Sequence, residues 1–138
     1  MRVMAFVKAN EASEAGTMPT TEELTEMGAF NEELVKAGVM LAGEGLHPTS
    51  RGVRVYYNGK ERKIVDGPFA EAKEVVAGFW IWQVKSMDEA IEWAKRSPFQ
   101  EGQLELRPVF ENDDFGDALT PELREQEDRM RQQTEQRK

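Results

Sequence analysis

Residues 75–84, with the sequence VVAGFWIWQV, are the most apolar stretch of the 138-residue chain and decide its fold. β-Branched and aromatic residues dominate the stretch, which predicts a strand in the centre of a β-sheet. Side chains alternate across a strand, so the two faces differ. One face carries Phe79, Ile81 and Gln83, and the other carries Trp80, Trp82 and Val84. Both faces offer apolar side chains, so both need a covering layer.

The segments around this strand predict a repeated order of elements. The expected elements are strands at 2–8, 39–46 and 103–110, and helices between Thr20 and Gly38 and between Ser86 and Pro98. With a hairpin inserted before the central strand, the order is β-α-β, hairpin, β-α-β. This order predicts an α+β fold, namely a ferredoxin-like split β-α-β sandwich with an antiparallel sheet and both helices on one face.

The two helices carry start signals and apolar stripes. Thr20 with Glu23, and Ser86 with Glu89, have the spacing of a capping box. Steps of three and four residues mark the expected buried positions. These are Leu24, Met27, Phe30 and Leu34 in the first helix, and Met87, Ala90, Ile91 and Ala94, with Trp93 beside them, in the second.

The inserted hairpin is predicted from Asn58-Gly59 between two alternating segments, because this pair is typical of a type I′ turn. If Asn58 and Gly59 form the loop, Tyr57 faces Lys60. The same register then places Arg51 opposite Asp66 at the open end of the hairpin.

The apolar sheet face that no helix covers predicts a protein–protein interface. An exposed apolar patch of this size marks an interface, and a homodimer packed through the open sheet face would cover it. The alternative is that the inserted hairpin folds over this face within one subunit.

The chain divides into a domain at 1–110 and an acidic C-terminal extension at 111–138. Thr120-Pro121 is typical of a helix start. The rest of the extension is almost wholly polar, so an exposed helix and a disordered terminus are both expected outcomes.

Composition excludes several classes of function. The net charge is −8, with 18 Lys and Arg against 26 Asp and Glu, which argues against nucleic acid and against an anionic membrane surface as partners. The chain has no cysteine, so disulfides and thiolate chemistry are excluded. No segment reaches transmembrane length and none is typical of a signal peptide, so we expect a cytoplasmic protein.

The candidate catalytic residues are His47 and Asp66. His47 is the one histidine of the chain. The predicted hairpin register brings His47, Arg51 and Asp66 to one rim, where a carboxylate could orient the imidazole as a general base and Arg51 could bind an anion. The alternative is that Asp66 shapes a turn, His47 is a loop residue and Arg51 forms a cross-strand ion pair.

Further residues are candidates for substrate binding. Glu44 lies between two glycines in an apolar strand, and Arg107 interrupts the apolar face of the last strand. The chain lacks metal-binding histidine pairs, a glycine-rich phosphate loop and a Ser-His-Asp pattern, so no metal or other cofactor is predicted.

Residues 66–74 (DGPFAEAKE) resemble the signature of the DGPF (DGPFAETKE) branch of the YCII-related proteins, with Ala72 in place of threonine. Segments 43–46 (GEGL) and 105–109 (ELRPV) are similar to further segments of that family. The resemblance covers residues 1–110. Phe69 of the signature joins the candidate substrate-binding residues.

The resemblance implies a dimeric α+β barrel, and a His–Asp active site for which Asp66 is the natural position. It implies a small-molecule-binding protein, with an isomerase- or lyase-type reaction as one function. The alternative is a non-enzymatic dimeric binding or regulatory module, because this fold also serves such modules.

Overall fold

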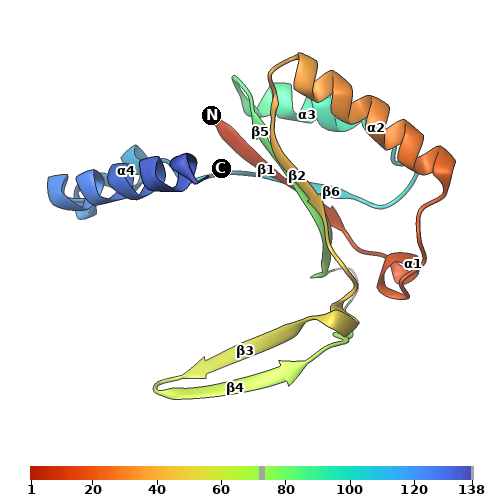
Figure 1. Ribbon diagram of the computed structural model, residues 1–138, viewed down its shortest axis with the longest axis horizontal. Coiled ribbons are helices and arrows are strands. Elements are labelled where there is room, and N and C mark those ends of the chain that lie inside the picture. The colour runs from red at the N-terminus through yellow and green to blue at the C-terminus, as the bar shows by residue number, and fades with distance from the viewer. Residues whose placement is uncertain (72–73, 138) are drawn as a thin grey trace. The chain divides into compact units, whose positions relative to one another are not determined.

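The computed structural model describes residues 1–71 and 74–137, and it separates into two compact units, Met1–Pro108 and Val109–Lys138. The first unit contains a four-stranded sheet, a separate hairpin and the helices α1, α2 and α3 (Figure 1). Ala72 and Lys73 of the DGPF signature lie outside the described residues. The two units are considered separately below.

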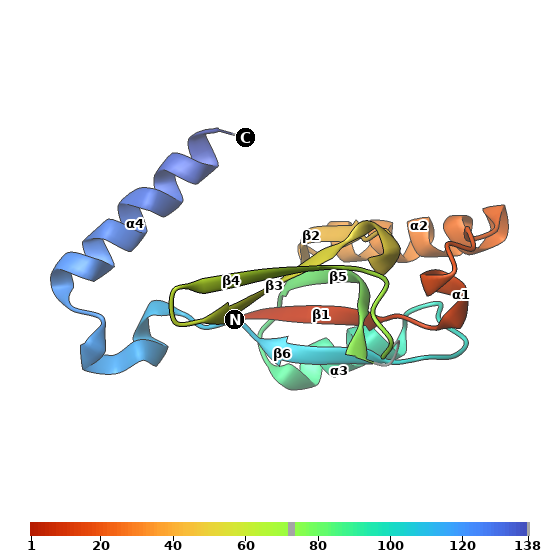
Figure 2. The same cartoon turned by 90° about the horizontal axis from the view of Figure 1, so that it is seen from below.

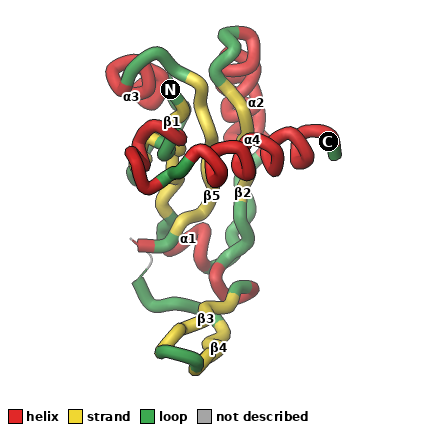
Figure 3. The backbone as a smooth tube through the Cα atoms, turned by 90° about the vertical axis from the view of Figure 1, so that its left-hand side faces the viewer, coloured by secondary structure: helices red, strands yellow, loops and turns green. Residues whose placement is uncertain are grey.

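The sheet has the strand order β2-β5-β1-β6 and is antiparallel throughout. Figure 3 shows β2, β5 and β1 side by side. Its strands are β1 (Arg2–Lys8), β2 (Met40–Gly45), β5 (Val76–Gln83) and β6 (Leu104–Pro108). With α2 (Thr21–Lys36) after β1 and α3 (Met87–Lys95) after β5, this is the predicted ferredoxin-like plan. The prediction of the fold class is therefore confirmed by the topology.

The alternation along β5 is also confirmed. Trp80 and Trp82 are 5% and 0% exposed, whereas Phe79 and Ile81 between them are only half-buried. The buried face packs against the helices. Its core comprises Val3, Ala5, Phe30, Leu34, Val39, Trp80, Trp82, Val84, Ala90 and Trp93.

The helix α2 begins with the predicted capping box. The Glu23 N–H donates to Thr20 Oγ1 over 3.1 Å, and the Thr20 N–H donates to Glu23 Oε1 over 3.4 Å. Gly38, at φ +72°, follows the helix end as expected for a C-terminal glycine. Phe30 and Leu34 are buried as predicted, but Leu24, in the first turn of α2, is 59% exposed and does not belong to the core.

The helix α3 begins after Ser86, whose Oγ accepts from the Glu89 N–H over 3.2 Å. The buried face differs from the prediction, since Trp93 is 9% exposed and Ile91 is 39% exposed. The larger indole takes the core position, and its Nε1 donates to Glu89 Oε2 over 3.2 Å.

The hairpin pairs β3 (Val53–Asn58) with β4 (Glu61–Asp66), but its register differs from the predicted one by two residues. Asn58 faces Glu61, so the loop is Gly59-Lys60, and Asp66 faces Val53 and not Arg51. Gly59 has φ +61°, whereas Lys60 has no positive φ. A glycine followed by a residue of negative φ matches a type II′ turn, which needs positive φ only at its first central position. Lys60 thus avoids the left-handed region.

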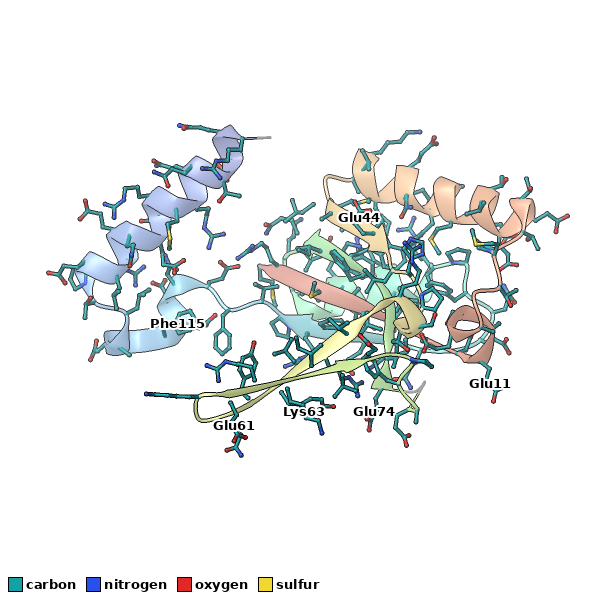
Figure 4. The ribbon with its side chains drawn as sticks, turned by 60° about the horizontal axis from the view of Figure 1, so that its bottom comes forward. Glu11, Glu44, Glu61, Lys63, Glu74 and Phe115 are labelled. Atoms are coloured by element: carbon teal, nitrogen blue, oxygen red, sulfur yellow. The ribbon has the colours of Figure 1, made fainter. Side chains whose placement is uncertain are left out.

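This hairpin, here called the arm (residues 53–66), leaves the lower end of the sheet and projects on the side away from α2 (Figures 1 and 2). All residues of β3 are exposed, and in β4 only Val65 is half-buried. The arm therefore does not cover the sheet face within one subunit. Figure 4 shows Glu61 and Lys63 extending from β4 into solvent.

The sheet face without helices has an apolar centre between charged edges. The register places Met4, Phe6, Phe79, Ile81 and Ala42 together on this face. All five are half-buried. Beside them Lys8 and Glu105 form an ion pair of 3.4 Å, in which the Lys8 side chain is 17% exposed.

The second unit consists of η3 (Asn112–Ala118) and α4 (Pro121–Gln136). Thr120 caps α4 by accepting from the Leu123 N–H over 3.2 Å. Phe110 stacks on Phe115 at 5.0 Å, and α4 has no buried residue among those described. The extension is thus helical but has little core. Within the described residues, no helix is both long enough and apolar enough to cross a bilayer.

Candidate functional site

The DGPF loop is held by a close approach between two backbones. A Cβ atom at position 67 would lie 1.7 Å from the carbonyl oxygen of Thr49, so only glycine fits. The Gly67 N–H also donates to the Gly52 carbonyl over 2.9 Å. The glycine of the signature therefore joins the base of the arm to the turn that follows β2.

Thr49, in the short helix η1 (Thr49–Arg51), connects three segments. Its hydroxyl accepts from the Phe69 N–H over 3.0 Å and donates to the carboxylate of Glu14. The Thr49 N–H donates to the same carboxylate over 3.0 Å. Because Glu14 ends α1 (Glu11–Glu14), this network ties α1, η1 and the DGPF loop together.

Phe69 is half-buried and lies against the arm. The Arg54 guanidinium carbon is 3.8 Å from the centre of the Phe69 ring, a cation–π contact. Phe69 thus fixes the direction in which the arm leaves its base.

The structure brings His47 and Arg51 into contact. Arg51 Nη1 lies 3.0 Å from both ring nitrogens of His47, and both side chains are exposed. The two lone-pair directions of an imidazole diverge in the ring plane, so a nitrogen equidistant from both ring nitrogens lies over the face of the ring. The Arg51 guanidinium therefore contacts the face of His47 and does not occupy the lone pair of either nitrogen.

Asp66 does not take the position that the predicted register gave it. Its cross-strand neighbour is Val53, and its carboxylate forms no hydrogen bond or ion pair within the described part of the chain. Asp66 nevertheless precedes Gly67, whose backbone touches Thr49, two residues beyond His47. Asp66, His47 and Arg51 therefore occur around one turn without a direct contact between the carboxylate and the imidazole.

A hollow of about 230 Å³ lies between α2 and the lower half of the sheet, and we call it the α2 hollow. Its floor consists of Gly43, Gly45 and Gly78, which pairing and alternation place on the helix side of β2 and β5. A Cβ at Gly43 would be 2.7 Å from Trp80 Cδ1, and a Cβ at Gly78 would be 2.9 Å from the Glu44 carbonyl oxygen, so these two positions are already filled by neighbours. Gly45 is the most open of them, since a Cβ there would meet no atom within 4 Å.

The walls of the α2 hollow are mainly apolar and aromatic. Trp80 and Phe99 meet edge to face at 6.2 Å, and Met27 lies beside them. The Trp80 Nε1–H donates to Asn31 Oδ1 over 3.0 Å. This bond fixes the orientation of the Asn31 amide, whose Nδ2 donor has no partner among the described residues.

Two further predicted residues have different placements. Glu44 borders the α2 hollow, but it pairs with Phe79, and this register directs its side chain to the open sheet face. Arg107 lies on β6 opposite Met4 and is exposed on that same face. The six candidate residues are thus distributed over the turn after β2, the DGPF loop and the open sheet face.

Sequence reasoning missed Asn31, although a signal was present. Asn31 follows Met27 by four residues and precedes Leu34 by three, so it belongs to the apolar stripe of α2. A polar side chain in a buried stripe needs a hydrogen-bond partner or marks a site. The glycines 43, 45 and 78 carried a second signal, but only strand pairing shows that they share one face.

The described residues contain no group of three or more His, Asp or Glu that could hold a metal ion. A wider depression of about 670 Å³ borders the other end of the DGPF loop, with Lys8, Glu11, Ala70 and Glu71 in its lining. It contains one lysine and two acids but none of the six candidate residues.

The topology and the α2 hollow define a ferredoxin-like α+β domain with a cavity between helix and sheet. The chain belongs to the YCII-related domain family, whose sequence model matches residues 1–113. It is 30% identical over 89 residues to the uncharacterized protein R00369 of Rhizobium meliloti (strain 1021), which covers 62% of this chain and 72% of that relative.

Among solved structures, the chain is similar to 5-chloro-2-hydroxyhydroquinone dehydrochlorinase (TftG) from Burkholderia phenoliruptrix AC1100, determined in complex with 2,5-dihydroxybenzoquinone. The sequence identity is 14% and the TM-score is 0.47. The alignment covers 80% of this chain and 94% of the dehydrochlorinase.

Gly67→Ala is expected to lower the free energy of unfolding by about 1–3 kcal/mol, because the new methyl group would displace the Thr49 carbonyl. Urea denaturation followed by circular dichroism measures this change. Gly28→Ala in α2 is the control, since a Cβ there meets no atom within 4 Å and alanine favours a helix by up to about 1 kcal/mol. Equal stability of wild type and Gly67→Ala would contradict the close approach.

Proposed function

We propose that this member of the YCII-related family binds a small molecule in the α2 hollow. The observation that carries the proposal is the glycine floor beside a single oriented amide. The hollow opens to solvent at Gly45 and Phe99, and its volume of about 230 Å³ admits a small molecule from outside. Apolar walls with few oriented polar groups are typical of ligand sites.

A second candidate function, proton transfer of the isomerase or lyase type, is favoured by the contact between His47 and Arg51. Gly45 lines the α2 hollow, and His47 follows it by two residues, so their Cα atoms are within about 7 Å. In this proposal His47 is the general base, Arg51 binds an anionic group, and Asp66 orients the imidazole or acts as an acid.

In this second proposal the anionic group of the ligand lies at the turn after β2, outside the α2 hollow. It binds the Arg51 guanidinium, because a carboxylate accepts a bidentate pair of hydrogen bonds. The His47 ring nitrogens, which Arg51 does not cover along their lone pairs, are then available to remove a proton from a carbon atom next to a carbonyl.

We also propose that the chain is a homodimer that packs through the open sheet face. Apolar side chains fill the centre of that face, with Phe6, Phe79 and Ile81 half-buried in the single chain. The arm supports the proposal, because an isolated two-stranded hairpin is only marginally stable in water. It exposes Val53, Val55, Tyr56, Tyr57 and Ile64 by 42–72%.

Charge favours a second copy as the partner of the arm. The arm (residues 53–66) contains four Lys or Arg and two acids, a net charge of +2 in a chain of −8. The remaining residues therefore carry −10, so a basic arm meets an acidic body when it extends toward another copy. Contacts of this kind would order both strands of the arm.

Gly45→Val is expected to abolish ligand binding without loss of stability, because the valine side chain fills the α2 hollow and favours a strand. Ligands selected from a fragment library by thermal shift of the wild type provide the measurement. Gly28→Val, on the exposed surface of α2, is the matched control and should retain binding. Ligands that bind Gly45→Val as tightly as wild type would rule out this site.

His47 is the single histidine, so its imidazole Hε1 resonance needs no assignment in untagged protein. Millimolar additions of a small carboxylate or lactone are expected to shift this resonance in wild type. The response should be lost in Arg51→Gln and reduced in Asp66→Asn. Lys36→Gln, which removes a positive charge from the last turn of α2, is the control. An equal response in wild type and Arg51→Gln would exclude Arg51 as the anion-binding residue.

Sedimentation equilibrium at micromolar concentration is expected to give twice the mass of the chain for wild type. Ile81→Lys should give the monomer mass, because a charge at the centre of the open sheet face cannot be buried without a partner. Leu24→Lys, at an exposed position of α2, should remain dimeric. A monomeric wild type would contradict the proposal.

A further inference from the structure

We infer that the ligand of the α2 hollow is an uncharged compound with a single flat ring that carries one hydrogen-bond acceptor. This inference rests on the proposed function of the hollow and specifies the class of ligand. Shape, charge and the orientation of one amide each restrict the class independently.

The floor restricts the shape. Gly43, Gly45 and Gly78 lie on adjacent strands, so the ligand meets a flat layer of peptide groups and not protruding side chains. The Trp80 indole occupies the position beside Gly43, where a Cβ would be 2.7 Å from Trp80 Cδ1. The free space therefore begins at Gly45 and is bounded by the Trp80 indole, a flat wall that suits a planar group.

The volume restricts the size. Sites for drug-sized ligands enclose roughly 300–1,000 Å³. The α2 hollow, at about 230 Å³, is smaller and suits one ring with a short substituent. Trp80 and Phe99 supply aromatic edges and faces, and a ligand ring beside them would gain binding energy from edge-to-face contacts.

The lining restricts the charge. Among the described residues that line the hollow there is no lysine, arginine or histidine, and its one acid, Glu44, pairs with Phe79 on the opposite face of the sheet. An anionic or cationic ligand would lose its hydration without gaining a countercharge. The ligand is therefore neutral within the hollow.

Asn31 restricts the polar contact. Its Oδ1 accepts from the Trp80 indole N–H, and the indole is a donor only, so the amide cannot turn round without losing this bond. The Nδ2 donor is the group that remains for a ligand. The matching group on the ring is a carbonyl or hydroxyl oxygen.

Benzamide, benzoate and cyclohexanecarboxamide test the restrictions on charge and shape, because benzoate differs from benzamide in charge and cyclohexanecarboxamide differs from it in the flatness of the ring. The indole Nε1–H resonance of Trp80, assigned with Trp80→Phe, reports occupancy of the hollow. We expect benzamide to shift it, with benzoate and cyclohexanecarboxamide binding at least about tenfold more weakly.

Asn31→Asp keeps an oxygen for the Trp80 N–H but replaces the Nδ2 donor. This variant should bind benzamide roughly 2–10-fold more weakly, as expected for one hydrogen bond. Asn58→Asp on the arm adds the same charge elsewhere and should bind benzamide like wild type.

The outcomes separate the ligand class from the site. If benzoate or cyclohexanecarboxamide binds more tightly than benzamide, and Gly45→Val abolishes this binding, the proposed ligand class is wrong but the hollow is still the binding site. No response to benzamide would also overturn the class. Benzamide binding that is unaffected by Gly45→Val would overturn both.

Discussion

The packing of the Trp80 indole is the constraint on which the rest of this domain depends. The indole lies on the buried face of β5 and contacts Phe30 of α2 and Trp82 on its own strand. Its N–H bond to Asn31 holds α2 at a defined rotation on the sheet. The same ring excludes any side chain at Gly43 of the neighbouring strand. One side chain thus fixes the helix, the glycine floor and one wall of the α2 hollow.

The DGPF signature has a structural role that can be stated atom by atom. Gly67 permits contact with the Thr49 carbonyl, and the amide after Pro68 binds the Thr49 hydroxyl. Phe69 then supports Arg54 at the start of the arm. Within this arrangement Asp66 is not needed to cap the turn. Its carboxylate remains unpaired within the described residues.

Local patterns predicted the topology because capping residues, helical stripes and strand alternation act over a few residues. The helix that starts at Thr20, the alternation of Trp80 and Trp82, and the hairpin around Gly59 all follow such short-range rules. The sequence did not predict the hairpin register correctly. Glycine fits both a type I′ turn over Asn58-Gly59 and a type II′ turn over Gly59-Lys60, and the structure has the second, in which only Gly59 needs a positive φ. Ile91 was misplaced because the competing indole of Trp93 is larger and lies on an adjacent part of the same helix.

The sequence by itself determined the order of elements, the two-sided apolar strand and the family, since these depend on composition and spacing. Only the tertiary structure decided which residues form a site. Asn31, Gly45 and Gly78 come from three elements, and they share a hollow because strand pairing and helix packing bring them together. The same pairing separates Glu44 from that hollow, and the shift of two residues in the hairpin separates Asp66 from Arg51. Such relations depend on long-range contacts, and neighbouring residues in the chain do not encode them.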